Sequence, residues 1–179
     1  AGCYARVGGA CGGDSMQTDL SREQWQTIFG EAAQLGIPFI LLAGGEPFMR
    51  RDVIEAAAQN KDIVFPVFTN GTMLDESYLS LLESHRNVIP VFSIEGEAAE
   101  TDNRRGEGVH AAVRSAMNRL HERGILFGAS ITVTSENLHT VSSPAFISEL
   151  RNSGCGLVFF VEYVPVDVST KYLALNTQE

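Results

Sequence analysis

The sequence predicts one α/β domain, residues 1–179, built on a parallel sheet. Five apolar runs rich in β-branched residues are nearly continuous, as expected of strands buried on both faces. Segments with helical spacing separate them at intervals of roughly 25–35 residues, which is typical of βα units. No Ser/Pro-rich linker or charge block divides the chain. The five runs are PFILLA (38–43), IVFPVF (63–68), NVIPVFSI (87–94), ILFGASITV (125–133) and LVFFVEYV (157–164).

The first helix is predicted within SREQWQTIFGEAAQLG, residues 21–36. Ser21 can cap it, with Gln24 three residues later as in a capping box. Gly36 is a stop signal. Its apolar stripe consists of Trp25, Ile28, Phe29 and Ala32, at i, i+3, i+4 and i+7.

Four further helices are expected at 52–60, from near Asp75, at 110–124 and at 143–154. The last has the clearest boundaries, because Ser143 can cap it, Pro144 fits the first helical position and Gly154 follows its end.

Composition and charge narrow the class of protein. The chain has 179 residues with a formal net charge of −9, which argues against nonspecific binding to nucleic acid or to an anionic membrane surface. No apolar segment approaches the ~20 residues that span a bilayer, and AGCYARVGG lacks the apolar core of a signal peptide. The three cysteines are an odd number, which favours reduced thiols in a cytoplasmic protein over a disulfide framework.

Polar residues follow the strand-like runs at their carboxyl ends, which read AGGEP, FTNGT, SIEGE, TVTSEN and VEYVP. Taken singly, each end is explained by ordinary turn chemistry. Because catalytic groups gather at the carboxyl ends of strands in parallel β/α folds, the five together predict a shared site. Neither GxxxxGK[ST] nor a GxGxxG after a strand occurs, which argues against a P-loop or a dinucleotide site.

GGEP, TNG, SIEG and the opening GCYAR, in this order, resemble the radical S-adenosylmethionine (SAM) enzymes. The resemblance covers essentially the whole chain and implies a partial (β/α)6 TIM-like barrel whose first strand is missing from this chain. It also implies a 4Fe–4S cluster held by a CxxxCxxC motif. Cys3 matches the last cysteine of that motif, whereas Cys11 and Cys155 do not fit its spacing and are interpreted as structural or surface thiols.

The cofactor chemistry explains the residue types that the resemblance assigns. Three cysteines leave one iron of the cluster open, much as a catalytic zinc keeps an open position. In the family that iron is chelated by SAM, and the reduced cluster cleaves SAM to a 5′-deoxyadenosyl radical that takes hydrogen from the substrate. The protein orients these groups and excludes water.

The GGEP turn is expected to hold the methionine part of SAM. Gly44 and Gly45 let the backbone approach a ligand where a Cβ would obstruct it. Glu46 and the neighbouring carbonyls suit the SAM ammonium group, and Pro47 fixes the turn. By the same resemblance, Thr69 and Asn70 line this rim.

The resemblance assigns further cofactor contacts to later strand ends. Ser93 and Glu95 match the family's SxDG-type strand end, with Glu in place of the commoner Asp. Arg105 resembles the family's arginine before glycine, a partner for the SAM carboxylate. Arg104 could serve instead, and a solvated surface pair is the other interpretation of these two arginines.

The remaining assignments concern the adenine and the substrate. Thr132, Thr134 and Asn137 follow the strand that lies along the adenine in relatives, although a β-branched strand end followed by a turn explains them equally well. Tyr4, the aromatic residue nearest Cys3, is the candidate for contact with the adenine of SAM, although the family's aromatic precedes the last cysteine, where this chain has Gly2. Of Glu162 and Tyr163, a pleated strand turns only one inward, and we expect Glu162 to face the substrate.

The expected partners are a small-molecule or peptide substrate and an external electron donor such as flavodoxin or ferredoxin. Cys3 is the only cysteine of the triplet in the printed sequence, so this fragment is expected to be inactive alone and, with one sheet edge exposed, to self-associate. One alternative is a catalytically dead scaffold or peptide-binding module. Another is a hydrolase that uses Glu46 and Glu95 as paired carboxylates.

Overall fold

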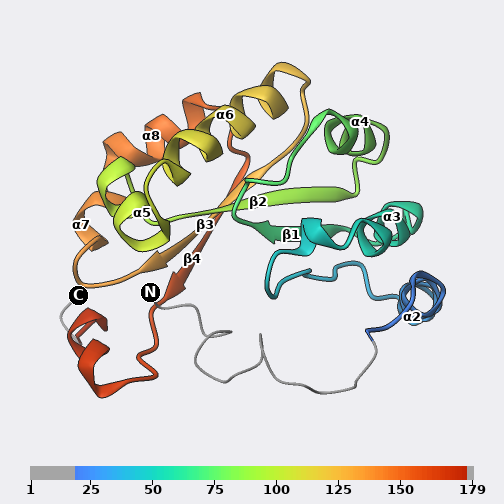
Figure 1. The fold of residues 1–179 in the computed structure, drawn as a ribbon, viewed down its shortest axis with the longest axis horizontal. Helices are drawn as coiled ribbons and strands as arrows, with labels where there is room; N and C mark the ends of the chain where they lie inside the picture. The colour runs from blue at the N-terminus through green and yellow to red at the C-terminus, as the bar shows by residue number, and fades with distance from the viewer. Residues whose placement is uncertain (1–18, 177–179) are drawn as a thin grey trace.

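The computed structural model describes residues 19–176, in which four parallel strands alternate with helices (Figure 1). The sheet order is β1-β2-β3-β4, so each strand pairs with the next along the chain, and the predicted parallel α/β architecture is confirmed. The strands are β1 (Phe65–Thr69), β2 (Val88–Ile94), β3 (Gly128–Val133) and β4 (Leu157–Glu162). The helices are α2 (Arg22–Gln34), η1 (Pro47–Met49), α3 (Arg51–Gln59), α4 (Glu76–Ser84), α5 (Ala98–Arg105), α6 (Val109–Glu122), α7 (Leu138–Val141), α8 (Pro144–Asn152) and η2 (Val168–Leu173).

The first apolar run, residues 38–43, lies beside β1 without forming a regular strand. It makes two isolated parallel bridges, Phe39 to Val64 and Leu42 to Val67. The Leu42 N–H donates to the carbonyl of Pro66 over 2.8 Å. The expectation that this run is buried on both faces is wrong, because Phe39 and Leu41 remain exposed. The run nevertheless brings the GGEP turn to the carboxyl end of β1.

Local signals place the helix starts where the sequence predicted them. The Ser21–Gln24 capping box is present at α2, and the side chains of Asp75 and Ser143 cap α4 and α8. Two short helices, α5 and α7, were not predicted. Segment 98–105 is polar and buries only Thr101, so it carries no apolar stripe to indicate a helix.

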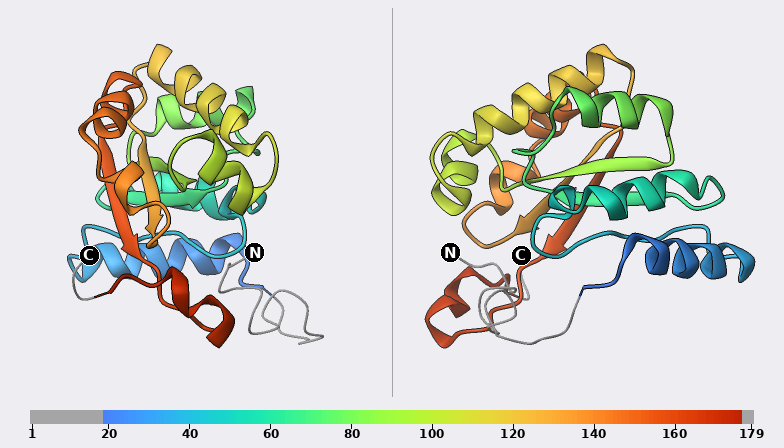
Figure 2. Two further views of the ribbon diagram at one scale, coloured as in Figure 1. Left: turned by 90° about the vertical axis from the view of Figure 1, so that its left-hand side faces the viewer. Right: turned by 45° about the vertical axis from the view of Figure 1, so that its right-hand side comes forward.

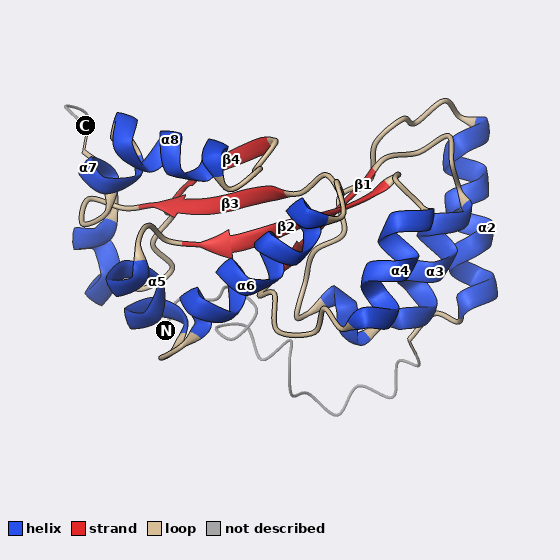
Figure 3. Cartoon of the chain, turned by 90° about the horizontal axis from the view of Figure 1, so that it is seen from above, coloured by secondary structure: helices blue, strands red, loops and turns tan. Residues whose placement is uncertain are grey.

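Strand register divides the sheet into two faces. Phe65 contacts Phe29 of α2, and Phe92 packs beside Gly71 and Val113 of α6, so these side chains lie on the face that the helices cover. The helices can be followed along the sheet in Figures 2 and 3. The opposite face carries a row formed by Ser93, Ser130 and Phe159, which are register partners.

This opposite face is concave. The rings of Phe68 on β1 and Phe159 on β4 lie 5.4 Å apart between centroids, although two strands separate β1 from β4. Three strand spacings in a flat sheet would amount to about 14 Å, so the sheet must curve to bring the rings together.

The strand β4 was predicted to be buried on both faces, but it is partly exposed on both. Phe160 is 50% and Val161 45% exposed. Within residues 19–176, no strand pairs with the outer edge of β4, since it ends the sheet order.

Candidate functional site

Glu46 joins the GGEP turn to the end of β1. Its carboxylate accepts hydrogen bonds from the Thr69 hydroxyl group and the Asn70 backbone N–H, each over 2.8 Å, and from the Phe48 N–H over 3.2 Å. Thr69 is buried, so the first bond is protected from water. The structure therefore brings Glu46, Thr69 and Asn70 together, as predicted, with Pro47 starting η1 directly behind them.

The two glycines before Glu46 face open space. Gly44 has a φ of +143°, which L side chains rarely adopt, and a Cβ built on Gly44 or Gly45 would meet nothing within 4 Å. The backbone of this turn is thus accessible to a ligand at the carboxyl end of the sheet.

A buried carboxylate between two arginines lies at the end of β2. Glu95 is 2% exposed, its Oε1 accepts from Arg105 Nη2, and its Oε2 accepts from Arg104 Nη1 over 3.3 Å. Burial raises the pKa of the Glu95 carboxyl group, and the guanidinium groups of Arg105 and Arg104 oppose that rise. The two arginines and Glu95 therefore form one unit, which the sequence did not predict.

Asn137 links the ends of β2 and β3. Its Nδ2 donates to the backbone carbonyls of Glu95 and Thr132, over 2.8 and 2.9 Å. Its Oδ1 accepts from the backbone N–H and the hydroxyl group of Thr134, over 2.7 and 3.1 Å. Asn137 is 4% exposed, so this is an internal cross-link at the same edge of the sheet as Glu95.

The last strand places its two candidate residues differently from the expectation. Glu162 is the register partner of Val133 and is exposed, whereas Ser93 and Thr132 belong to the alternate set of positions that face the concave side. Tyr163 is 7% exposed, and the Arg104 guanidinium lies 5.6 Å from its ring centroid. The structure thus brings Tyr163, not Glu162, to the group around Glu95.

Cys3 and Tyr4, predicted for the cluster and for SAM, lie outside the described residues. Among residues 19–176, no group of three or more His, Cys, Asp or Glu side chains could hold a metal ion. In the same part of the chain, no helix has the length and apolarity that crossing a membrane requires.

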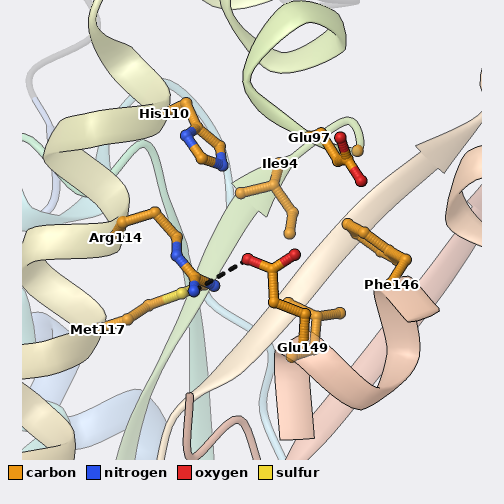
Figure 4. A pocket seen from close by; sticks show the side chains of 9 residues that line it. Ile94, Glu97, His110, Arg114, Met117, Phe146 and Glu149 are labelled. Atoms are coloured by element: carbon orange, nitrogen blue, oxygen red, sulfur yellow. Dashed lines mark ion pairs between the residues drawn. The ribbon is translucent and has the colours of Figure 1, made fainter. Parts of the chain in front are cut away.

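A small hollow lies at the C-terminal end of β2, between α6 and α8, and is lined in part by Ile94 and Gly96, the chain neighbours of Glu95 (Figure 4). Arg114 of α6 reaches across it to Glu149 of α8 in a 3.0 Å ion pair, beside His110. A second, apolar hollow of about 360 Å³ is lined by Val133, Leu138, Val141, Ser142, Ile147 and Phe160. Neither contains Glu46, Glu95 or Arg105.

Two observations test whether the described residues fit SAM. The Nε of Arg105 is buried and has no hydrogen-bond acceptor within residues 19–176, so it lacks the kind of partner that a carboxylate supplies. The space beside Gly44 and Gly45 is open at the same edge of the sheet. Both observations fit a ligand that carries an α-amino acid group.

The fold and site define a parallel α/β domain with carboxylate, amide and guanidinium groups gathered where its strands end. Residues 2–142 match the family model described as the Radical SAM superfamily. The chain belongs to the radical SAM superfamily, as the strand-end motifs indicated.

Similar proteins agree with this membership. Fe-coproporphyrin III synthase of Methanosarcina barkeri is 28% identical over 165 residues, covering 90% of this chain and 40% of that protein. PqqA peptide cyclase of Rhizobium meliloti is 36% identical over 91 residues, covering 49% and 24%. The structure of Streptococcus suis SuiB bound to S-adenosylmethionine superposes with a TM-score of 0.68 at 19% identity, covering 89% of this chain and 37% of SuiB. The chain spans less than half the length of each, and the superposition confirms the partial-barrel fold.

Proposed function

We propose that this chain is the core domain of an enzyme that binds SAM and a 4Fe–4S cluster. The bound cluster would supply the electron that cleaves SAM to a 5′-deoxyadenosyl radical, which abstracts hydrogen from the substrate. The proposal depends on two features of this radical SAM chain, an open glycine turn and a buried Nε of Arg105 that has no acceptor among residues 19–176.

Each group at the strand ends has a role in this proposal. The Gly44–Gly45 backbone receives the amino acid part of SAM, because no Cβ obstructs it. Glu46 holds that turn against β1 through Thr69 and Asn70. Arg105 binds the SAM carboxylate through Nε, while its Nη2 stays on Glu95. Ser93 and Thr132, whose register puts them on the concave face, are proposed to contact the nucleoside.

Cys3 is proposed as one ligand of the cluster, as the last cysteine of a CxxxCxxC motif. A peptide or a small molecule is the proposed substrate class, since the similar proteins include a peptide cyclase and a coproporphyrin enzyme. An external reductant such as flavodoxin or ferredoxin would deliver the electron.

The test is anaerobic reconstitution of the full-length protein with iron and sulfide. Iron–thiolate absorption and formation of 5′-deoxyadenosine from SAM are expected for the wild type and lost in Cys3→Ser. The matched control is Cys155→Ser, because Cys155 is half-buried at the start of β4 and its thiol bonds the Leu157 carbonyl. A wild-type protein that forms no cluster and does not cleave SAM would instead support a noncatalytic scaffold.

A further inference from the structure

The structure points to Asn137 and Thr101 as positioning residues for the SAM carboxylate. We propose that they fix the backbone of Glu95 from two sides, so that Glu95 holds Arg105 with its Nε available to that carboxylate. This inference rests on the proposed function, because it assumes that Arg105 binds SAM and assigns to Asn137 and Thr101 the orientation of its guanidinium group.

The Asn137 amide is fully engaged inside the protein. An amide side chain has two N–H donors and two acceptor positions. Both donors go to carbonyls, those of Glu95 and Thr132, and both acceptor positions are taken by Thr134. Asn137 therefore acts by holding two strand ends together and has no further hydrogen-bonding group to offer to an adenine.

Thr101 holds the other side of Glu95. Its hydroxyl oxygen accepts from the Glu95 backbone N–H over 3.1 Å and donates to the Gly96 carbonyl over 3.3 Å. Thr101 is 0% exposed and lies on α5, the helix that carries Arg104 and Arg105. The N–H of Glu95 is thus tied to α5, and its carbonyl is tied to the turn after β3.

These ties set the direction of Arg105. The Glu95 carboxylate is buried and accepts from Nη2 of Arg105, which fixes one edge of a planar guanidinium group. The Nε belongs to the same plane, is buried, and finds no acceptor within residues 19–176. A small displacement of the Glu95 backbone would rotate that plane, so the ties at Asn137 and Thr101 control where Nε points.

The experiment compares two ligands with the full-length protein after anaerobic cluster reconstitution. One is SAM, and the other is decarboxylated SAM, which lacks the group that Arg105 would bind. Thr101→Val and Asn137→Asp each remove hydrogen bonds to the Glu95 backbone with little change in side-chain shape. We expect both variants to weaken SAM binding by about tenfold, since hydrogen bonds to charged groups contribute on this scale. The dissociation constant for decarboxylated SAM should stay unchanged.

Two variants serve as controls. Thr101→Ser keeps the hydroxyl group and should restore SAM affinity. Asn87→Asp removes a similar internal tie, because Asn87 Nδ2 donates to the carbonyls of Ala57, Asn60 and Ile63 over 3.0–3.3 Å at the amino end of the sheet. It should lower stability and leave SAM affinity unchanged.

The outcomes separate this inference from the function on which it rests. A wild-type protein that does not bind SAM overturns both. A wild-type protein that binds SAM, with unchanged affinity in Thr101→Val and Asn137→Asp, overturns the positioning role alone. If the variants lose equal affinity for SAM and for decarboxylated SAM, or if Asn87→Asp loses as much SAM affinity as they do, the substitutions damage the protein generally. Either result would also overturn the positioning role. If Asn137→Asp does not fold, the SAM affinities of Thr101→Val and Thr101→Ser decide whether the positioning role holds.

Discussion

The hydroxyl group of Thr69 donates a 2.8 Å hydrogen bond to the carboxylate of Glu46, and this bond fastens the GGEP turn to the end of β1. Thr69 also accepts from the Gly71 N–H over 3.0 Å and is 1% exposed. One buried hydroxyl group therefore satisfies two partners at the edge of the sheet where the site lies.

Replacing Thr69 by Val should destabilise the protein by about 1–3 kcal/mol, because the half-buried Glu46 carboxylate and the buried Gly71 N–H lose their partner together. The free energy of unfolding, from urea titrations, measures the change. Thr72→Val is the control, since the Thr72 hydroxyl bonds Asn70 at an exposed position. Similar stability of Thr69→Val and Thr72→Val would contradict a fastening role for Thr69.

The buried position of Glu95 predicts a large effect for its removal. Glu95→Ala leaves Arg104 and Arg105, whose side chains are 23% and 26% exposed, without their carboxylate. Breaking such a buried pair typically costs about 3–5 kcal/mol, and we expect a loss of this order in the free energy of unfolding.

Glu76 provides a matched control for Glu95. It also lies between two arginines, Arg119 at 2.7 Å and Arg123 at 2.5 Å, but its side chain is 69% exposed. Water and salt screen such a pair, so Glu76→Ala should have a much smaller effect that decreases further at high ionic strength. An effect equal to that of Glu95→Ala would mean that burial does not decide the strength of the Glu95 unit.

The sequence predicted those parts of the fold that depend on neighbouring residues. The caps at Ser21, Asp75 and Ser143 act within three residues, so their signals are local. The Glu95–Arg105 pair spans ten residues and depends on the turn at Gly96, with a φ of +141°, and on the unpredicted helix α5. Without that helix, a solvated pair of arginines was an equally good interpretation.

The choice between Glu162 and Tyr163 shows a second limit of prediction from the sequence. Alternation along a strand says that neighbours point to opposite faces, but it does not say which face is inward. Only the register of β4 against β3, with Thr132 opposite Val161 and Val133 opposite Glu162, places Tyr163 beside Arg104. That register arises from pairing between distant segments, for which the sequence carries no local signal.

Asp102 should make stability depend on pH in the acid range. Its carboxylate accepts from the backbone N–H groups of His110 and Gly108, over 2.8 and 3.1 Å, and these bonds lower its pKa. Because the folded pKa lies below the unfolded value of about 3.9, the stabilisation is complete above that value and is lost as the pH falls through the folded pKa.

Asp102→Asn should therefore melt at a lower temperature than the wild type at pH 7, and the difference should shrink as the pH falls below about 4. Thermal unfolding followed by circular dichroism at several pH values measures this. Asp62→Asn, on the exposed turn before β1, is the control for loss of a surface charge. A difference that stays constant down to the lowest accessible pH would contradict the assignment.

Substitutions at the two glycines of the GGEP turn distinguish the effect of backbone strain on stability from the effect of an added side chain on ligand binding. A Cβ at either position meets nothing within 4 Å, but only Gly44 has a positive φ, +143°. Gly44→Ala should lower the free energy of unfolding by about 1–3 kcal/mol, as expected of a side chain forced into a sparsely populated conformation. Gly45→Ala should leave stability unchanged.

If SAM occupies the open space beside the turn, both variants must weaken its binding, by about tenfold or more, since a methyl group then stands in the path of the ligand. Equilibrium binding of SAM to the reconstituted full-length protein measures this, with Gly30→Ala in α2 as a control, because a Cβ there also meets nothing within 4 Å. Gly45→Ala is the decisive variant, since it changes the ligand's space without straining the backbone. Unchanged SAM affinity in Gly45→Ala would place the ligand elsewhere and remove the reason for two glycines at this strand end.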